Sequence, residues 1–314
     1  MNQIVELKNK VLENVGKVII GKDKEIELLL IAFLSEGHIL LEDLPGMGKT
    51  MMVRSFSKTL DLPFKRIQFT PDLLPGDITG VSFYNQKTKD FEFREGPLFS
   101  NIILADEINR ATPRTQAALL EAMEERQITV DGETRKLKKP FMVLATQNPI
   151  ESYGTFPLPE AQMDRFLMRI KLGYPSKAEE KIILLNTLGE VLENLKTVSD
   201  MESIFFMMEE IRKVTISDEV MDYLLDIVRS TRDHEEISLG VSPRGSIALY
   251  RASQVKAALE GRDYIIPEDI QDMAVHTLNH RILLEDASSV EDCISRITMI
   301  MREIKVPLEN LEES

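Results

Sequence analysis

A glycine-rich segment between a short apolar run and an amphipathic stretch constrains this chain more than any other feature. Residues 43–50 read DLPGMGKT, which matches three of the four fixed positions of the pattern G-x-x-x-x-G-K-[ST]. A loop of this kind joins a buried strand to a helix, and its backbone N–H groups surround phosphate oxygens at the helix N-terminus. The segment therefore predicts a phosphate-binding loop within an α/β fold.

The loop residues divide into those that shape the backbone and those that carry chemistry. Gly46 and Gly48 permit the turn and the close approach of a ligand. Lys49 would neutralise the β- and γ-phosphates of a nucleotide, and Thr50 would offer its hydroxyl to Mg²⁺. Asp43 stands where glycine is usual, so a glycine turn followed by a chance Lys-Thr pair is the alternative. The candidate nucleotide contacts here are Pro45, Gly46, Met47, Gly48, Lys49, Thr50 and Met51.

Two carboxylates follow a later apolar run, in the segment NIILADE at residues 101–107. Side chains at the carboxyl end of a parallel strand face the ligand crevice. We expect Asp106 to hold Mg²⁺, directly or through water, and Glu107 to activate a water for attack on the γ-phosphate. Two solvated loop carboxylates are the alternative. The functional interpretation is favoured because a phosphate loop about 60 residues upstream needs such a partner.

Short apolar runs alternate with helical stretches through the first half of the chain. This alternation predicts a parallel sheet covered by helices on both faces. After residue 175 the pattern is helical, so we expect an α/β nucleotide-binding domain at residues 1–175 and a smaller, all-helical domain at 176–314. The expected strands lie at 39–41, 64–69, 102–104, 141–144 and, more weakly, 169–172.

Composition limits the compartment and the partners. The 314 residues include 38 Lys and Arg against 52 Asp and Glu, a net charge of −14, which disfavours general binding to nucleic acid or anionic membranes. Cys293 is the single cysteine, which excludes an intramolecular disulfide. The apolar runs are far shorter than the roughly 20 residues of a membrane span, and the first residues lack a signal-peptide core. We therefore expect a cytoplasmic protein with no membrane span.

Several segments, taken in this order, resemble the AAA+ ATPases and, within them, the MoxR family. In that family an acidic residue commonly replaces the first loop glycine, so Asp43 fits the resemblance. The resemblance covers nearly the whole chain and implies an ATP- and Mg²⁺-dependent ATPase, with a P-loop AAA+ core followed by a helical lid. The segments are 41–50, 69–80 (FTPDLLPGDITG), 105–111 (ADEINRA), 156–166 (FPLPEAQMDRF) and 242–245 (SPRG).

The resemblance implies roles that spacing does not. Asn148 looks like sensor 1, which would hydrogen-bond the attacking water or the γ-phosphate, and a turn cap is the alternative. Arg165 matches the arginine finger that acts on a neighbouring subunit's nucleotide. A surface ion pair with Asp164 is the alternative. Arg244 looks like sensor 2 on the first turn of a lid helix, and whether it acts in its own subunit or the next stays open.

Three further elements are placed by the same resemblance. Ile20 and Gly21 lie in a segment similar to the one that packs on adenine, with ordinary core packing as the alternative. Residues 81–96 lie where this clade has its helix-2 insert, and residues 127–138 match the pre-sensor-1 hairpin. Such hairpins would project from a ring and contact a substrate. Ordinary solvated hairpins are the alternative. The basic run at 135–139 favours a solvated face over a nucleic-acid contact.

The family also implies an assembly and a purpose. Its members form rings, by resemblance hexamers, in which hydrolysis moves the lid against the core and remodels a protein client. Chaperone-like maturation, including metal insertion, and a partner with a von Willebrand factor A domain are implied by the family alone. A nucleic-acid motor or a metal-chelatase motor subunit of the same clade is the alternative function. A nucleotide-gated scaffold is disfavoured, because it would need no water activator such as Glu107.

Overall fold

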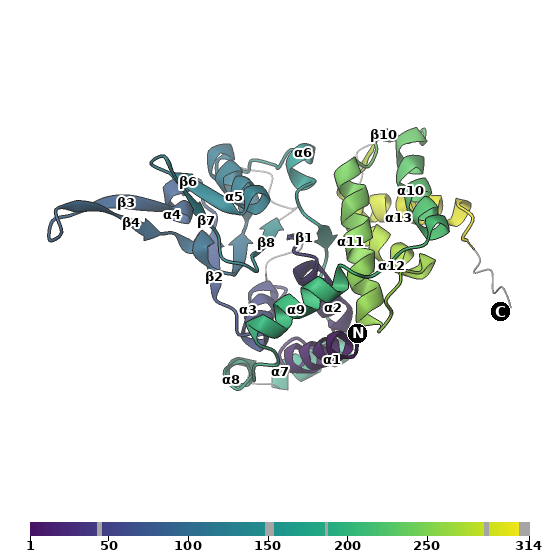
Figure 1. Ribbon diagram of the computed structural model, residues 1–314, viewed down its shortest axis with the longest axis horizontal. Helices are drawn as coiled ribbons and strands as arrows, with labels where there is room; N and C mark the ends of the chain where they lie inside the picture. The colour runs from purple at the N-terminus through teal and green to yellow at the C-terminus, as the bar shows by residue number, and fades with distance from the viewer. Residues whose placement is uncertain (43–45, 148–153, 186–187, 286–288, 308–314) are drawn as a thin grey trace. The chain divides into compact units, whose positions relative to one another are not determined.

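Five short strands form the sheet that carries the phosphate loop. The computed structural model describes residues 1–42, 46–147, 154–185, 188–285 and 289–307. The sheet order is β2-β5-β8-β1-β9, and the pairs β1–β8, β8–β5 and β5–β2 are parallel (Figure 1). The predicted parallel sheet is thus confirmed. Its strands are β1 (Ile39–Glu42), β2 (Phe64–Gln68), β5 (Ile102–Asp106), β8 (Met142–Gln147) and β9 (Met168–Ile170).

The register of this sheet brings distant segments to one edge. Gln68, the last residue of β2, lies opposite Asp106, the last residue of β5. Glu42, at the end of β1, lies opposite Gln147 at the end of β8. Because parallel strands point the same way, the loops that follow them leave from the same edge. The phosphate loop, after β1, and the acidic pair, at the end of β5, therefore lie at the same edge of the sheet, with only β8 between their strands.

The chain divides into two compact units that are not separated by a single cut. The sheet unit comprises residues 9–166 and 170–203, and the helical unit comprises residues 1–8, 167–169 and 204–314. This division differs from the single boundary expected at residue 175. The stretch from 176 to 203 groups with the sheet unit because of packing that the sequence pattern does not show.

Contacts of Leu192, Leu195 and Val198 illustrate this packing. Val18 packs on Leu192 and Leu195, and the Val198 N–H donates to the Thr59 carbonyl at 2.9 Å.

The helices of the sheet unit are α1 (Asn2–Gly16), which begins in the helical unit, α2 (Asp23–Leu34), α3 (Lys49–Thr59), α4 (Pro75–Thr79), α5 (Pro113–Glu125), α6 (Glu160–Met163), α7 (Lys177–Leu185) and α8 (Leu188–Glu193).

Two antiparallel hairpins extend the sheet unit at the expected places. The first is β3 (Gly80–Asn85) with β4 (Asp90–Glu95), which runs away from the sheet in Figure 1. The second is β6 (Gln127–Val130) with β7 (Glu133–Lys136). Its turn residues, Asp131 and Gly132, both have positive φ, as a tight two-residue hairpin turn requires.

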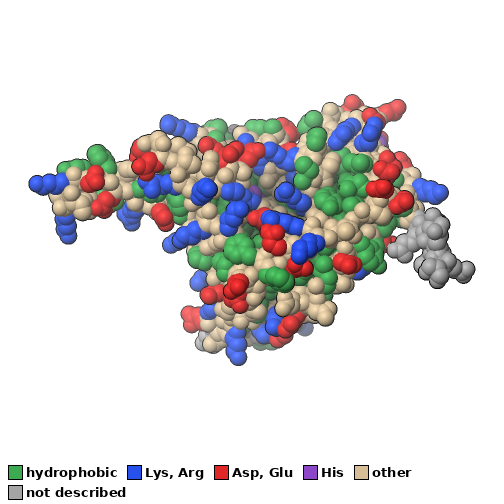
Figure 2. All heavy atoms as spheres, in the orientation of Figure 1, with side chains coloured by type: hydrophobic (Ala, Val, Ile, Leu, Met, Phe, Trp, Pro, Cys, Tyr) green, Lys and Arg blue, Asp and Glu red, His purple; other side chains and the backbone are tan. Residues whose placement is uncertain are grey.

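The hairpins contact each other through one basic residue. The guanidinium carbon of Arg135 lies 4.2 Å from the centre of the Phe93 ring, so this member of the basic run is engaged within the chain. Figure 2 shows basic and acidic side chains mixed along the β3–β4 hairpin. Phe83, Tyr84 and Phe91 add exposed aromatic surface to it.

Among its described residues, the second unit consists mainly of helices, one of which begins in the sheet unit at residue 201, together with a pair of very short strands. Ser217, Ser242 and Ser289 accept N-terminal backbone N–H groups of their helices, which is why those helices begin where they do. The sequence predicted an all-helical domain, and the structure differs by one short antiparallel pair, β10 (Ile237–Leu239) and β11 (Leu283–Leu284). The helices are α9 (Met201–Ile211), α10 (Asp218–Asp233), α11 (Pro243–Leu259), α12 (Pro267–Thr277) and α13 (Val290–Glu303). In the described part of the chain, no helix has the length and apolar character to cross a membrane.

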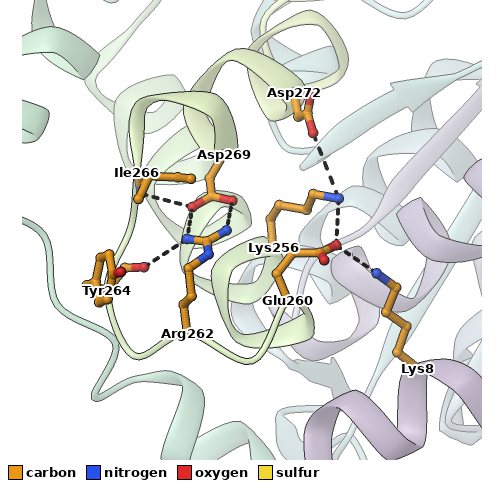
Figure 3. A network of polar contacts seen from close by, with 8 residues as sticks. All are labelled: Lys8, Lys256, Glu260, Arg262, Tyr264, Ile266, Asp269 and Asp272. Atoms are coloured by element: carbon orange, nitrogen blue, oxygen red, sulfur yellow. Dashed lines mark hydrogen bonds and ion pairs between the residues drawn. The ribbon is translucent and has the colours of Figure 1, made fainter. Parts of the chain in front are cut away.

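A buried ion pair fixes the turn between α11 and α12 (Figure 3). Arg262 donates two hydrogen bonds, of 2.7 and 2.6 Å, to the two carboxylate oxygens of Asp269. Asp269 is buried and also accepts the Ile266 N–H at the start of α12, at 2.9 Å. Beside this pair, Glu260 accepts hydrogen bonds from Lys8 and Lys256, which ties the first helical residues of the chain to the end of α11.

Replacing Asp269 with alanine should lower the free energy of unfolding by about 3 kcal/mol, because Arg262 and the Ile266 N–H lose a buried partner. Asp272 provides the matched control. Its carboxylate is mostly exposed and lies 3.8 Å from Lys256, so Asp272→Ala should change stability by less than about 0.5 kcal/mol. Urea unfolding followed by circular dichroism measures both. Equal effects of the two substitutions would contradict the assignment.

A buried histidine, His38, links β8 and α5. The Nδ1 atom of His38 accepts the Val143 N–H at 3.0 Å, and its Nε2 lies 3.1 Å from the Met123 carbonyl. Since a carbonyl only accepts, Nε2 carries the proton and His38 is neutral. Burial, reinforced by the positive charge of Arg126, lowers the pKa of His38 from 6.5 to about 3.

Acid should therefore destabilise the fold through His38. Between pH 6.5 and about 3 the unfolded chain binds a proton at His38 and the folded chain does not, so stability falls as the pH falls, by up to about 1.4 kcal/mol per pH unit. His38→Asn keeps an acceptor near Nδ1 and removes the titrating group. Unfolding free energies measured from pH 7 to 4 should decline less steeply in this variant. Parallel slopes for the two proteins would contradict the prediction.

Candidate nucleotide-binding site

A cavity of about 370 Å³ lies at the carboxyl edge of the sheet. It brings the phosphate loop and the acidic pair together, as their positions after β1 and β5 predict. It also contains residues from β2 and β8 that sequence reasoning did not select. The lining residues are Gly46, Met47, Gly48, Lys49, Thr50, Met51, Arg66, Gln68, Asp106, Glu107, Thr146 and Gln147.

The loop backbone has the conformation that its glycines permit. Gly46 and Gly48 have φ of 86° and 80°, in the left-handed region that side chains disfavour. A Cβ at either position would meet no atom within 4 Å, so space lies open beside this backbone. Gly48 is the N-cap of α3, and Lys49 and Thr50 are the first residues of that helix. The positive end of the α3 dipole is therefore directed to the place where phosphates would bind.

The acidic pair is held in a strained turn by a threonine. Glu107 has φ 57° and ψ 50°, a left-handed conformation that costs a non-glycine residue about 1 kcal/mol. Its N–H donates to the Thr146 hydroxyl at 2.8 Å, and that hydroxyl donates to the Asp106 carboxylate at 2.6 Å. Thr146 is buried near the end of β8. One hydroxyl thus fixes both acidic residues.

Strand β2 contributes two side chains that hold the same carboxylates from the other side. The Gln68 amide donates to the Glu107 carboxylate at 2.7 Å. Arg66 donates to the Asp106 carboxylate through Nε at 3.1 Å and Nη2 at 2.5 Å. Arg110 adds an ion pair to Glu107, with its Nε 3.2 Å from the carboxylate. The sequence signal that could have identified Arg66 and Gln68 is their spacing: two polar residues, two positions apart, in an expected strand of the sheet.

The oxygen donors fit Mg²⁺ bound together with a nucleotide. Thr50 supplies a hydroxyl and Asp106 a carboxylate, the hard ligands that Mg²⁺ prefers. Mg²⁺ is commonly held by one or two carboxylates plus substrate phosphates, rather than by a cage made wholly of protein. Across the residues that the structure describes, no group of three or more His, Cys, Asp or Glu forms such a cage.

The predicted adenine segment lies in the turn between α1 and α2. Gly21 has φ 71°, and a Cβ there would collide with the Glu179 carboxylate. Val18, just before it, is buried against Leu192 and Leu195, and Met51 of the cavity packs against the same apolar cluster. Val18 therefore contributes to core packing, and its cluster adjoins the cavity at Met51.

The remaining predicted residues lie elsewhere or outside the described ranges. Asp43, Pro45 and Asn148 fall outside the described residues. Arg165 follows α6, and its Nε lies 3.0 Å from the Glu124 carboxylate on α5. The ion-pair alternative for Arg165 named Asp164, so the partner found in the structure is a different carboxylate. Arg244 is the second residue of α11 in the helical unit, on the first helical turn as expected.

Comparison with known proteins agrees with this geometry. Residues 38–168 match the model of the ATPase family associated with various cellular activities (AAA), and residues 229–297 match the AAA lid domain. The chain is 39% identical to Chaperone MoxR1 of Mycobacterium tuberculosis, over 90% of this chain and 78% of that protein. It is 30% identical to Protein MoxR of Methylorubrum extorquens, over 86% of each.

The chain belongs to the MoxR family of AAA+ ATPases. It is also 51% identical to the uncharacterised protein YeaC of Bacillus subtilis, over 96% of each. A crystal structure of a protein from Cytophaga hutchinsonii, provisionally described as an ATPase, superposes with a TM-score of 0.86 at 40% identity and covers 98% of both chains. The family and the fold together establish this MoxR protein as an ATPase with an AAA core and a helical lid.

Replacing Thr146 with valine should remove the support of both acidic residues without changing the side-chain shape. The Glu107 N–H and the Asp106 carboxylate each lose a partner, so we expect kcat to fall by about 100-fold and stability by about 2 kcal/mol. Thr146→Ser keeps the hydroxyl and should retain most of the activity. Steady-state ATP hydrolysis and urea unfolding measure these effects. A valine variant as active as the serine variant would contradict the assignment.

Proposed function

We propose that this MoxR protein uses Mg²⁺-dependent ATP hydrolysis to remodel or mature a protein client, including metal insertion, from within a ring of identical subunits. The observation that carries the chemical part is the single cavity that unites Lys49 and Thr50 with Asp106 and Glu107. A phosphate cradle, two Mg²⁺ ligands and a water activator are the parts that phosphoryl transfer to water requires.

In this proposal the loop and the α3 N-terminus bind the nucleotide phosphates. Lys49 would balance the β- and γ-phosphate charge, and Thr50 and Asp106 would hold Mg²⁺, which would supply positive charge to the transferring group. Adenine would lie against the turn that contains Ile20 and Gly21, beside the apolar cluster that includes Met51. That placement is supported by the cluster's position next to the cavity.

Glu107 takes the proton of the attacking water in the proposed reaction. Gln68 and Arg110 hold its carboxylate at 2.7 and 3.2 Å, so these contacts must loosen before it accepts a proton from water. Asn148, which follows β8 in the sequence, would orient that water. Its role rests on the family resemblance.

Two arginines connect hydrolysis to the assembly. Arg165 would leave Glu124 and neutralise charge on the nucleotide of a neighbouring subunit. Arg244 would join the lid to the γ-phosphate, in its own subunit or the next. Loss of the γ-phosphate would then move lid against core, and the exposed aromatics of the β3–β4 hairpin are candidate client contacts.

The biological part of the proposal rests on relatives. One relative is named a chaperone, which supports a protein client. A hexameric ring, a von Willebrand factor A domain partner and a cytoplasmic location come with the family resemblance. Light scattering with and without ATP tests the ring, and Glu107→Gln should assemble with ATP while hydrolysing almost none. Failure of the wild type to assemble or to turn over ATP would overturn the proposal.

Mixing two inactive variants tests whether Arg165 acts on a neighbour. Arg165→Ala should lower kcat by about 1,000-fold while ATP still binds. Glu107→Gln subunits lack their own activity but retain Arg165. Mixed rings should therefore regain hydrolysis at Arg165→Ala sites that adjoin a Glu107→Gln subunit. Steady-state turnover of each variant and of the mixture is the measurement, and a mixture that stays inactive despite co-assembly would place Arg165 in its own subunit's site or outside the mechanism.

A further inference from the structure

Arg66 occupies a position that the proposed mechanism leaves without a role. It lies on β2 opposite Leu104, two residues before Gln68, which lies opposite Asp106. Alternate residues of a strand share a face, so Arg66 and Gln68 project to the same side as Asp106. Arg66 also lines the cavity beside the phosphate loop. A second cation besides Lys49 therefore sits within the nucleotide site.

The contacts of Arg66 engage the carboxylate that the metal is expected to need. Its Nε and Nη2 both donate to Oδ2 of Asp106, and Oδ1 of Asp106 accepts the Thr146 hydroxyl. Both oxygens of this carboxylate thus already have donors. A guanidinium and a divalent cation repel each other, so they do not share Oδ2 at contact distance. The Asp106 side chain is 15% exposed and the Arg66 side chain 47%, so the arginine has room to leave toward solvent.

The same guanidinium also sets the orientation of Gln68. Arg66 Nη2 donates to the Gln68 amide oxygen at 2.7 Å. The amide nitrogen is thereby directed to Glu107, to which it donates at 2.7 Å. One arginine thus connects the proposed metal ligand to the proposed water activator through a chain of three hydrogen bonds.

We propose that Arg66 is a positioning residue that competes with the divalent cation for the Asp106 carboxylate. With a cation bound beside the nucleotide phosphates, the Arg66 guanidinium would leave Oδ2 of Asp106 and turn toward solvent. Gln68 would then lose the contact from Arg66 that orients its amide. This inference rests on the proposed roles of Asp106 and Glu107.

The test measures cation affinity directly. Binding of Mn²⁺ is followed by the electron paramagnetic resonance signal of the free ion, in the presence of a non-hydrolysable ATP analogue. Arg66→Met should bind Mn²⁺ about fivefold more tightly than the wild type, because the competing donor is gone. Lys65→Met is the matched control. It removes the same charge from the next residue of β2, whose exposed side chain points to the other face.

Each remaining outcome has one meaning. Unchanged or weaker Mn²⁺ binding in Arg66→Met overturns the inference, as does equal tightening in Lys65→Met, which would reveal only a general charge effect. Weaker binding of the analogue in EDTA by Arg66→Met would make Arg66 a phosphate ligand and also overturn it. Asp106→Asn separates the two proposals. If Asp106→Asn weakens Mn²⁺ binding while Arg66→Met does not alter it, the inference alone fails; if Asp106→Asn has no effect, the proposed metal role fails too.

A second readout follows the same competition during turnover. The Mg²⁺ concentration that gives half-maximal ATP hydrolysis should fall in Arg66→Met by about the same factor as the Mn²⁺ dissociation constant. A residue that merely stabilised β2 would lower the maximal rate and leave this concentration unchanged. That result would overturn the inference.

Discussion

The site depends on the two hydrogen bonds that the Thr146 hydroxyl makes. This hydroxyl accepts the N–H of Glu107 and donates to the carboxylate of Asp106, so a single atom joins a strained turn to the strand beside it. This geometry is available only because β5 and β8 pair in parallel and end together. The buried sheet thus supplies the rigidity that keeps two like charges next to each other, and the loop alone would not.

The sequence predicted those parts of the site whose residues are contiguous in the chain. The phosphate loop was recognisable because its glycines, lysine and threonine are adjacent and fulfil fixed backbone and charge requirements. The acidic pair was recognisable because it ends an apolar strand. The sheet strands followed from the alternation of apolar runs with helical stretches, and the helical character of the second half followed from its periodicity, for which the local sequence is sufficient.

The parts that were missed arise from register and packing. Gln68 becomes significant because it lies opposite Asp106, and Arg66 because it shares a strand face with Gln68. Neither relation is visible without knowing which strands are neighbours. The partner of Arg165 is similar, since Glu124 lies 41 positions earlier and the two meet only in the fold. The affiliation of residues 176–203 likewise depends on contacts with Val18 and Thr59 rather than on composition.

The division into two units has a consequence for the connectivity of the chain. The chain passes from one unit to the other after residues 8, 166, 169 and 203. Neither unit is therefore a continuous stretch of sequence, and α1 begins in one unit and ends in the other. A single cut therefore cannot separate the two units cleanly: a cut after residue 203 leaves the whole sheet unit on a fragment that also carries residues 1–8 and 167–169 of the helical unit. Truncation at one position likewise leaves the helical unit without the segments that it takes from earlier in the chain.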